Sequence, residues 1–86
     1  QIQAEGAGRW RLLGSVPLRE LDRELELRLD ERGEARTVAG LLVELAGDRV
    51  PTAGETFALP DGDSLEVVEA SPRRVRVARL HRRKVP

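Results

Sequence analysis

The segment TVAGLLVELAG, residues 37–47, constrains the fold of this chain more than any other stretch. Thr37 is a good N-cap, Gly47 suits a left-handed C-cap, and Pro51 prevents the helix from resuming. Glu44 is the only polar residue between the two caps, so apolar side chains occupy nearly every side of the predicted helix. Such a helix must be covered on more than one side. Other elements of this short chain must therefore pack around it.

Glycines within and after this helix predict its surroundings. Gly40 lies inside the helix, where glycine costs about 1 kcal/mol relative to alanine. We expect a close approach of another backbone to compensate, because glycine has no side chain to hold a neighbour off. Residues 47–54 hold two glycines and a proline but no residue type that suggests chemistry. They predict a tight connection into a strand that begins near Glu55.

Length and composition indicate one small globular domain. The chain has 86 residues, 40% of them hydrophobic, and no cysteine. The lack of cysteine excludes a disulfide framework and thiolate chemistry. The apolar runs span a few residues only, far short of the roughly 20 that cross a bilayer. The chain opens on Gln1 rather than Met, and we therefore expect it to be a fragment of a longer protein.

The remaining elements follow from periodicity and turn residues. Gly6-Ala7-Gly8 predicts a turn between two N-terminal strands, and Pro17 suits the first turn of a helix. Leu25, Leu27 and Leu29 alternate, which favours an extended segment after that helix. The predicted strands are 1–5, 9–13, 55–59, 65–70 and 74–80, the predicted helices are 15–25 and 38–46, and a charged loop covers 30–36. A bulge or strand end is expected near Ala78-Arg79, where the alternation of the last strand changes phase.

This order of elements predicts an α+β fold, of the type ββααβββ. We expect a mainly antiparallel sheet with both helices packed on one face. The core is predicted from the apolar positions of the helices and strands: Leu18, Leu21, Leu25, Val38, Leu41, Leu42, Leu45, Val67 and Val77. Trp10 and Phe57, the only large aromatic residues, are expected to join it.

Charge is unevenly distributed although the net charge is zero. Residues 71–86 hold no acid and seven basic residues, which are Arg73, Arg74, Arg76, Arg79, Arg82, Arg83 and Lys84. The first seventy residues hold the other eight basic residues and all fifteen acids, a net charge of −7. A basic strand face beside acidic neighbours is the favoured interpretation, and a nucleic-acid or anionic-lipid surface is the alternative. The candidate surface for an anionic partner is Arg73, Arg74, Arg76 and Arg79, and residues 81–86 are expected to fray.

No catalytic or metal motif is recognisable. Asp61-Gly62-Asp63 supplies too few ligands for a calcium loop and predicts a hairpin turn. His81, the only histidine, has no partner residue types nearby in the sequence and is expected to be solvated. The glycines form neither a dinucleotide fingerprint nor a P-loop. Three carboxylates on the first helix are interpreted as a solvated face rather than an acid–base pair: Glu20, Asp22 and Glu24.

Four segments in order resemble the CorC/HlyC transporter-associated domain. They are W-x-L-x-G-x-x-P-L-x-E-L from Trp10, T-V-A-G-L-L-V-E-L-A-G-D-R-V-P-T-A-G-E from Thr37, S-L-E-V-V-E-A from Ser64 and R-V-R-V from Arg74. The resemblance covers nearly the whole chain, with residues 1–80 as the domain. It implies an α+β fold similar to a subdomain of FAD-binding (PCMH-type) enzymes. It offers no catalytic residues.

The resemblance implies a non-enzymatic accessory domain of a bacterial membrane protein that exports magnesium and cobalt or is hemolysin-like. The implied partners are a CBS-domain pair and the membrane domains of the parent chain, with a homodimer as a further contact. The implied location is the cytoplasmic side of the inner membrane. No cofactor, metal or nucleic acid is expected. The alternatives are a sensor that binds flavin or an adenine nucleotide, by fold analogy alone, and the regulatory domain of a potassium/proton antiporter.

Overall fold

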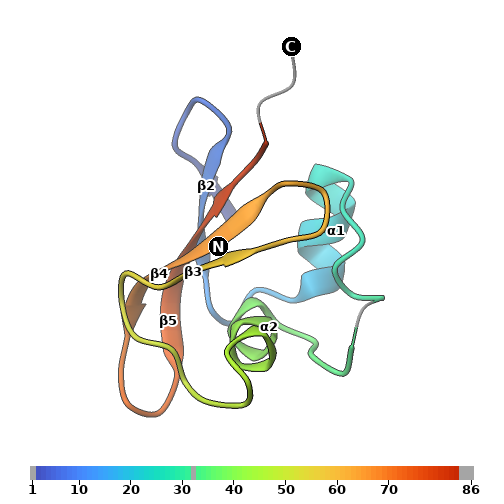
Figure 1. The fold of residues 1–86 in the computed structure, drawn as a ribbon. Coiled ribbons are helices and arrows are strands. Elements are labelled where there is room, and N and C mark those ends of the chain that lie inside the picture. Colours follow the sequence, from blue (N-terminus) through green and yellow to red (C-terminus); the bar gives the residue numbers. More distant parts are fainter. Residues whose placement is uncertain (1, 32, 84–86) are drawn as a thin grey trace.

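The computed structural model describes residues 2–31 and 33–83 and has the predicted order of elements (Figure 1). Two strands come first, two helices follow, and three strands complete the chain. The strands are β1 (Ile2–Ala4), β2 (Arg9–Leu13), β3 (Thr56–Ala58), β4 (Ser64–Ala70) and β5 (Val75–His81). The helices are α1 (Leu18–Leu25) and α2 (Val38–Leu45).

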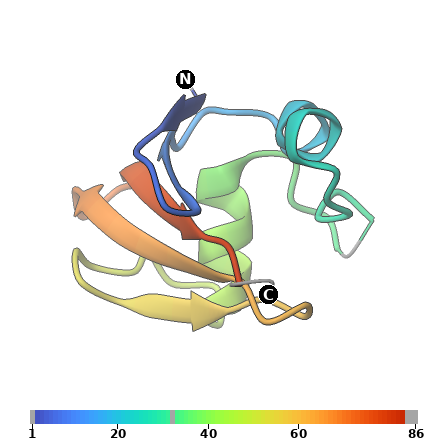
Figure 2. The same cartoon turned by 90° about the horizontal axis from the view of Figure 1, so that it is seen from above.

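The five strands form one antiparallel sheet in the order β1-β2-β5-β4-β3. Three of the four pairings are hairpins between consecutive strands. The fourth joins β2 to β5 and brings the N-terminal hairpin against the last strand, so β5 lies in the middle of the sheet. Figure 2 shows both helices on the same side of the sheet, with α2 next to the strands. The predicted α+β fold is confirmed.

The N-terminus of α2 is fixed by the connection between β2 and α1. The N–H groups of Val38 and Ala39 donate to the carbonyls of Val16 and Gly14, and the Thr37 hydroxyl accepts from the N–H of Gly40. A Cβ on Gly14 would lie 2.2 Å from the carbonyl oxygen of Val75. The close backbone approach that we expected at Gly40 therefore occurs at Gly14. At Gly40 the nearest neighbour of an added Cβ would be the Thr37 side chain, at 3.3 Å.

The core lies between the helices and one face of the sheet. Seven of the nine predicted core residues are buried, namely Leu18, Leu21, Val38, Leu41, Leu42, Val67 and Val77. Leu25 is half-buried against the core, as are Trp10 and Phe57. The prediction for Leu45 was wrong: this side chain is 39% exposed. Leu45 lies in the last turn of α2. The apolar face of the helix continues into this turn, but the buried residues Val38, Leu41 and Leu42 all lie before Leu45.

Two local predictions need correction in β4 and β5. The register shifts twice. Val68 is an extra residue in β4, between the pairs Val67–Ala78 and Glu69–Val77, and Arg76 is an extra residue in β5, between Glu69–Val77 and Ala70–Val75. The irregularity of β5 therefore lies at Arg76 and not at Ala78-Arg79. The predicted fraying of residues 81–86 also starts too early in the chain, because residues 81–83 are held by hydrogen bonds. His81 ends β5, the N–H of Arg82 donates to the carbonyl of Gly8, and that of Arg83 donates to Asp63. Residues 84–86 lie outside the described part of the chain.

Candidate functional site

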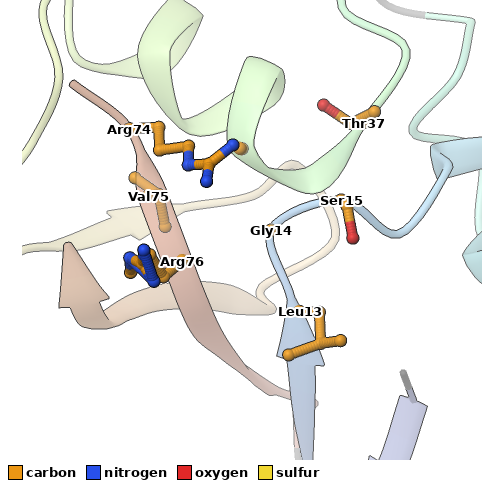
Figure 3. Close-up of a pocket in the computed structure, with 8 residues that line it drawn as sticks. Leu13, Gly14, Ser15, Thr37, Arg74, Val75 and Arg76 are labelled. Atoms are coloured by element: carbon orange, nitrogen blue, oxygen red, sulfur yellow. The ribbon is translucent and has the colours of Figure 1, made fainter. Parts of the chain in front are cut away.

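A pocket opens where the end of β2, the start of α2 and the start of β5 meet. Its volume is about 350 Å³. Figure 3 shows its walls, with Arg74, the residue before β5, extending toward α2 and the Ser15 and Thr37 side chains on the opposite side. Eight residues line it: Leu13, Gly14, Ser15, Thr37, Ala39, Arg74, Val75 and Arg76.

The pocket exists because three backbone segments converge on Gly14. Its N–H donates to the carbonyl of Arg76 at 2.8 Å, and its carbonyl accepts from Ala39 at 2.9 Å. Val75 points into the core and is 2% exposed. Arg74, just before β5, and Arg76, the second residue of β5, lie one position to each side of Val75 and are exposed at the pocket wall.

The pocket is positively charged and contains hydrogen-bond donors. Among residues 2–31 and 33–83, neither the Arg74 nor the Arg76 guanidinium has an ion pair or hydrogen bond. The Thr37 oxygen accepts from Gly40, which leaves its O–H to donate. The first N–H groups of α2 are already bonded to the protein. The donors that face the pocket are therefore side chains, and none of its eight lining residues is an acid.

The structure separates the four arginines of the predicted anionic-partner surface. Arg74 and Arg76 come together at the pocket, and Arg73 is exposed in the preceding turn. Arg79 belongs to a different environment, because its guanidinium is 2.7 Å from Glu5 and 3.2 Å from Glu66. Arg79 therefore has its anionic partners within the domain, and the surface itself stays a prediction for the other three.

The Arg79 network extends to His81, which we expected to be solvated. The His81 Nε2 lies 2.9 Å from the Glu66 Oε1 and its side chain is about one-third exposed. The hydrogen bond from His81, together with that from Arg79, lowers the pKa of Glu66 below the ordinary value of 4.5. The hydrogen bond from Arg79 likewise lowers the pKa of Glu5. These four side chains come from β4, β5 and the β1–β2 turn, and they form one network of hydrogen bonds and ion pairs.

The connection from α2 to β3 is held by Glu55. Its carboxylate accepts two hydrogen bonds from the Arg49 guanidinium, at 2.9 and 2.6 Å, and two from the N–H and hydroxyl of Thr52. These bonds, that from Arg49 foremost, lower the pKa of Glu55 to about 2. The predicted tight connection is present. The Glu55 carboxylate, whose pKa is strongly lowered, stabilises it by binding Arg49 and Thr52 of the same connection.

Two further carboxylates, those of Asp22 and Glu44, hold loops in place, a role that sequence reasoning missed. Asp22 accepts from the N–H groups of Leu29 and Asp30, so it is not the solvated group that we predicted. The Glu44 carboxylate accepts from the backbone N–H groups of Glu34 and Ala35. In the sequence, the only sign of this role is an acidic residue several positions before or after an irregular or glycine-containing loop.

The turn at residues 61–63 is a hairpin turn, as predicted. The N–H of Leu59 donates to the carbonyl of Asp63, and that of Gly62 donates to Leu59. The Asp63 carboxylate is 6% exposed, accepts from Arg83 at 2.6 Å, and has the Arg82 Nε at 3.2 Å. The alignment of that Nε is too poor for a hydrogen bond. Asp63 thus anchors the end of β5 to the β3–β4 turn.

Neither a metal centre nor a membrane-spanning helix is found in the described residues. Residues 2–31 and 33–83 contain no group of three or more His, Cys, Asp or Glu side chains arranged to hold a metal ion. Within the same ranges, neither helix has the length and hydrophobicity that crossing a membrane requires. The expectations about a flavin or nucleotide cofactor stay predictions.

The antiparallel sheet with two helices on one face defines the class, a small α+β domain. The chain belongs to the CorC_HlyC family, described as the transporter associated domain, whose family model matches residues 3–84. The predicted family is confirmed. The transporter-associated domain is a non-catalytic type of accessory domain in CorC and hemolysin-like proteins.

Similar proteins agree with this family. The UPF0053 protein YegH of Escherichia coli K12 is 40% identical over 60 residues, which cover 70% of this chain and 11% of YegH. The CorC-associated region of Neisseria meningitidis MC58 has a TM-score of 0.83 at 25% identity, covering 94% of this chain and 96% of that one. The corresponding domain of Nitrosomonas europaea has a TM-score of 0.80 at 29% identity, with 95% of each chain covered.

A third solved relative is a complex with divalent cations. The domain of a Xylella fastidiosa Temecula1 hemolysin, in complex with Mg²⁺ and Mn²⁺, has a TM-score of 0.81 at 25% identity and covers 96% of this chain and 98% of that one. These relatives are transporter-associated domains, and they lend no support to the expected likeness to a flavin-binding subdomain.

Proposed function

We propose that this chain is a non-catalytic regulatory domain of a bacterial membrane protein that exports divalent cations, and that it acts by contact with the parent's other domains. The match of the family model over residues 3–84 carries this proposal. YegH supports it as well. The chain is 40% identical to a segment that makes up only about 11% of YegH, which fits an accessory domain within a longer protein. The Xylella domain in complex with Mg²⁺ and Mn²⁺ fits a cation-handling parent.

The chemistry of the carboxylates supports a role without catalysis. Those with the closest contacts hold loops or balance arginines: Glu5, Asp22, Glu44, Glu55, Asp63 and Glu66. A catalytic carboxyl needs a cleft and a pKa near the operating pH. Here the resolved pKa shifts of carboxyls are downward, which keeps them ionised.

The pocket rim is the contact surface that we favour for a CBS pair or a membrane domain on the cytoplasmic side of the inner membrane. Leu13 is 42% exposed and lines the same pocket as Arg74 and Arg76, neither of which has an ion pair within residues 2–31 and 33–83. An apolar side chain surrounded by cations suits an interdomain contact, since such contacts are more polar than a core. Self-association through the same rim is the alternative contact, and sedimentation of the domain would detect it.

The test is transport by the full-length parent with and without this domain. We expect deletion to change the rate or regulation of Mg²⁺ or Co²⁺ export while the membrane part still transports. Leu13→Asp should reproduce part of the change, and Leu45→Asp, on the exposed end of α2, serves as the matched control. Transport and regulation that are identical without the domain would contradict the proposal, as would a parent that moves neither cation.

A further inference from the structure

The pocket beside Gly14 contains several hydrogen-bond donors and no anionic group. Arg74 immediately precedes β5 and Arg76 is the second residue of β5, so the two lie one position to each side of Val75. Neither has an anionic partner in the part of the chain that the structure describes, and none of the eight lining residues is an acid. Two cations with no anion between them repel one another, and an anionic group placed between them would relieve that repulsion.

Arg79 and Arg82, further along this end of the chain, are in a different state. Arg79 contacts Glu5 and Glu66, and Arg82 lies 3.2 Å from Asp63. Acidic side chains thus neutralise Arg79 and Arg82, whereas Arg74 and Arg76 have no acidic partner within residues 2–31 and 33–83. The difference is one of position, because the acids that pair with Arg79 come from β4 and the β1–β2 turn.

We infer that the pocket binds a phosphate-class oxyanion, supplied by a phosphorylated small molecule or by an anionic lipid headgroup. Guanidiniums match phosphate oxygens with paired N–H donors. The Ser15 and Thr37 hydroxyls provide two further donors on the opposite wall (Figure 3). Two forks and two hydroxyls suit an anion with three or four oxygens better than a carboxylate, which has two.

The helix N-terminus does not supply the binding energy. The N–H groups of Val38, Ala39 and Gly40 already donate to Val16, Gly14 and Thr37. The recognition falls on the side chains, and the apolar Leu13 and Ala39 line the wall that the organic part of a phosphate ester would contact. This inference goes beyond the proposed regulatory role and does not depend on it.

The experiment measures binding to the 86-residue domain itself, since relatives of nearly this length were solved as separate chains. One arm titrates inorganic phosphate and glycerol 3-phosphate and follows the amide resonances of Gly14, Ser15 and Val75. The other arm measures co-sedimentation with vesicles of phosphatidylglycerol, with phosphatidylcholine vesicles as the reference. The variant R74Q/R76Q is compared with R19Q/R23Q, which removes two exposed charges from α1.

We expect R74Q/R76Q to bind at least tenfold more weakly, and R19Q/R23Q to bind within twofold of the original chain. The variant R74K/R76K keeps the charge but loses the paired donors, and it should fall between them. Saturable binding of the soluble phosphates identifies a small-molecule ligand, and binding of phosphatidylglycerol vesicles alone identifies a headgroup. The absence of binding in both arms would overturn the inference, and so would an equal loss in the two double glutamine variants.

If R74Q/R76Q were misfolded, its amide spectrum would change throughout, and Ser15→Ala then provides the second test. Ser15 is exposed and its side chain makes no hydrogen bond within residues 2–31 and 33–83. Its loss should weaken phosphate binding about threefold without altering the fold. These measurements use no transport assay, so failure of the inference and failure of the proposed regulatory function are distinguishable.

Discussion

The two ends of β5 carry the same kind of residue in opposite environments. At its end, Arg79 and His81 are within hydrogen-bond distance of Glu5 and Glu66. At its start, Arg74 and Arg76 face a pocket whose lining has no acid. A basic run in a sequence therefore has two meanings. The paired part contributes to the fold, and the unpaired part is where a partner is to be sought.

The largest expected effect comes from closing the pocket at its base. In Gly14→Val, the first added carbon alone would lie 2.2 Å from the Val75 carbonyl oxygen, so β5 or the N-terminus of α2 must move. We expect a loss of about 3 kcal/mol in the free energy of unfolding, the upper end for overpacking. Urea denaturation measures it. Ser15→Ala, at the next position, should change stability by less than about 0.5 kcal/mol, and similar values for both would contradict this account of the pocket.

The next effect tests the anchor at the paired end. Asp63→Asn keeps the size of a side chain that is 6% exposed but removes the charge that faces Arg82 and accepts from Arg83. We expect a loss of about 2 kcal/mol, typical of a buried hydrogen bond to a charged group. Asp61→Asn, two residues away and exposed, is the matched control. Equal stability of the two variants would show that the end of β5 is not anchored by Asp63.

A smaller effect concerns the stability of the domain at acidic pH. The pKa values of Glu5 and Glu66 are lowered below 4.5 by hydrogen bonds to Arg79 and His81, so folding favours their ionised forms. Their contribution to stability is complete above pH 4.5 and is lost as the pH falls through their folded values. The variant E5Q/E66Q should therefore have a lower Tm than the original chain at pH 6 and a shallower decline below pH 4.5.

The start of β5 provides the control for this titration. The variant R74Q/R76Q should keep the original shape of Tm against pH, because no carboxyl with a lowered pKa contacts those arginines in the described residues. If E5Q/E66Q had the same dependence of Tm on pH as the original chain, the ion pairs at the end of β5 would not contribute to stability. Some decline must remain in any case, since Glu55 has a pKa of about 2 and lies elsewhere.

Features determined by local sequence were predictable. The caps of α2, its termination by Gly47 and Pro51, and the turn at 61–63 depend on residues within one turn of each other, and these predictions were confirmed. The pairing of β2 with β5 joins residues about seventy positions apart, and no periodicity reports it. Leu45 shows a related limit. A helix that is apolar all round does not indicate which side remains uncovered.

The site was predictable by residue type but not by arrangement. Arg74 and Arg76 were predicted to share one strand face, but β5 begins at Val75 and its register shifts at Arg76. Arg79 was grouped with them because its acidic partners come from other segments. Thr37 was recognised as a cap and Ser15 was passed over, because the wall that they share forms only when α2 meets the β2–α1 connection. The carboxylates that hold loops were missed for the same reason, since a backbone N–H is not visible as a partner in a sequence.

The smallest expected change sharpens the comparison most. Replacing both Arg74 and Arg76 by glutamine removes two charges from the domain, yet stability should change by no more than about 0.5 kcal/mol, since neither arginine has a charged partner within the part of the chain that the structure describes. Relief of like-charge repulsion would make the change favourable at low salt and negligible at high salt. Thermal unfolding at two ionic strengths measures this. A clear loss of stability would mean that these arginines have an internal role like that of Arg79, and the pocket would then be part of the fold rather than a place for a ligand.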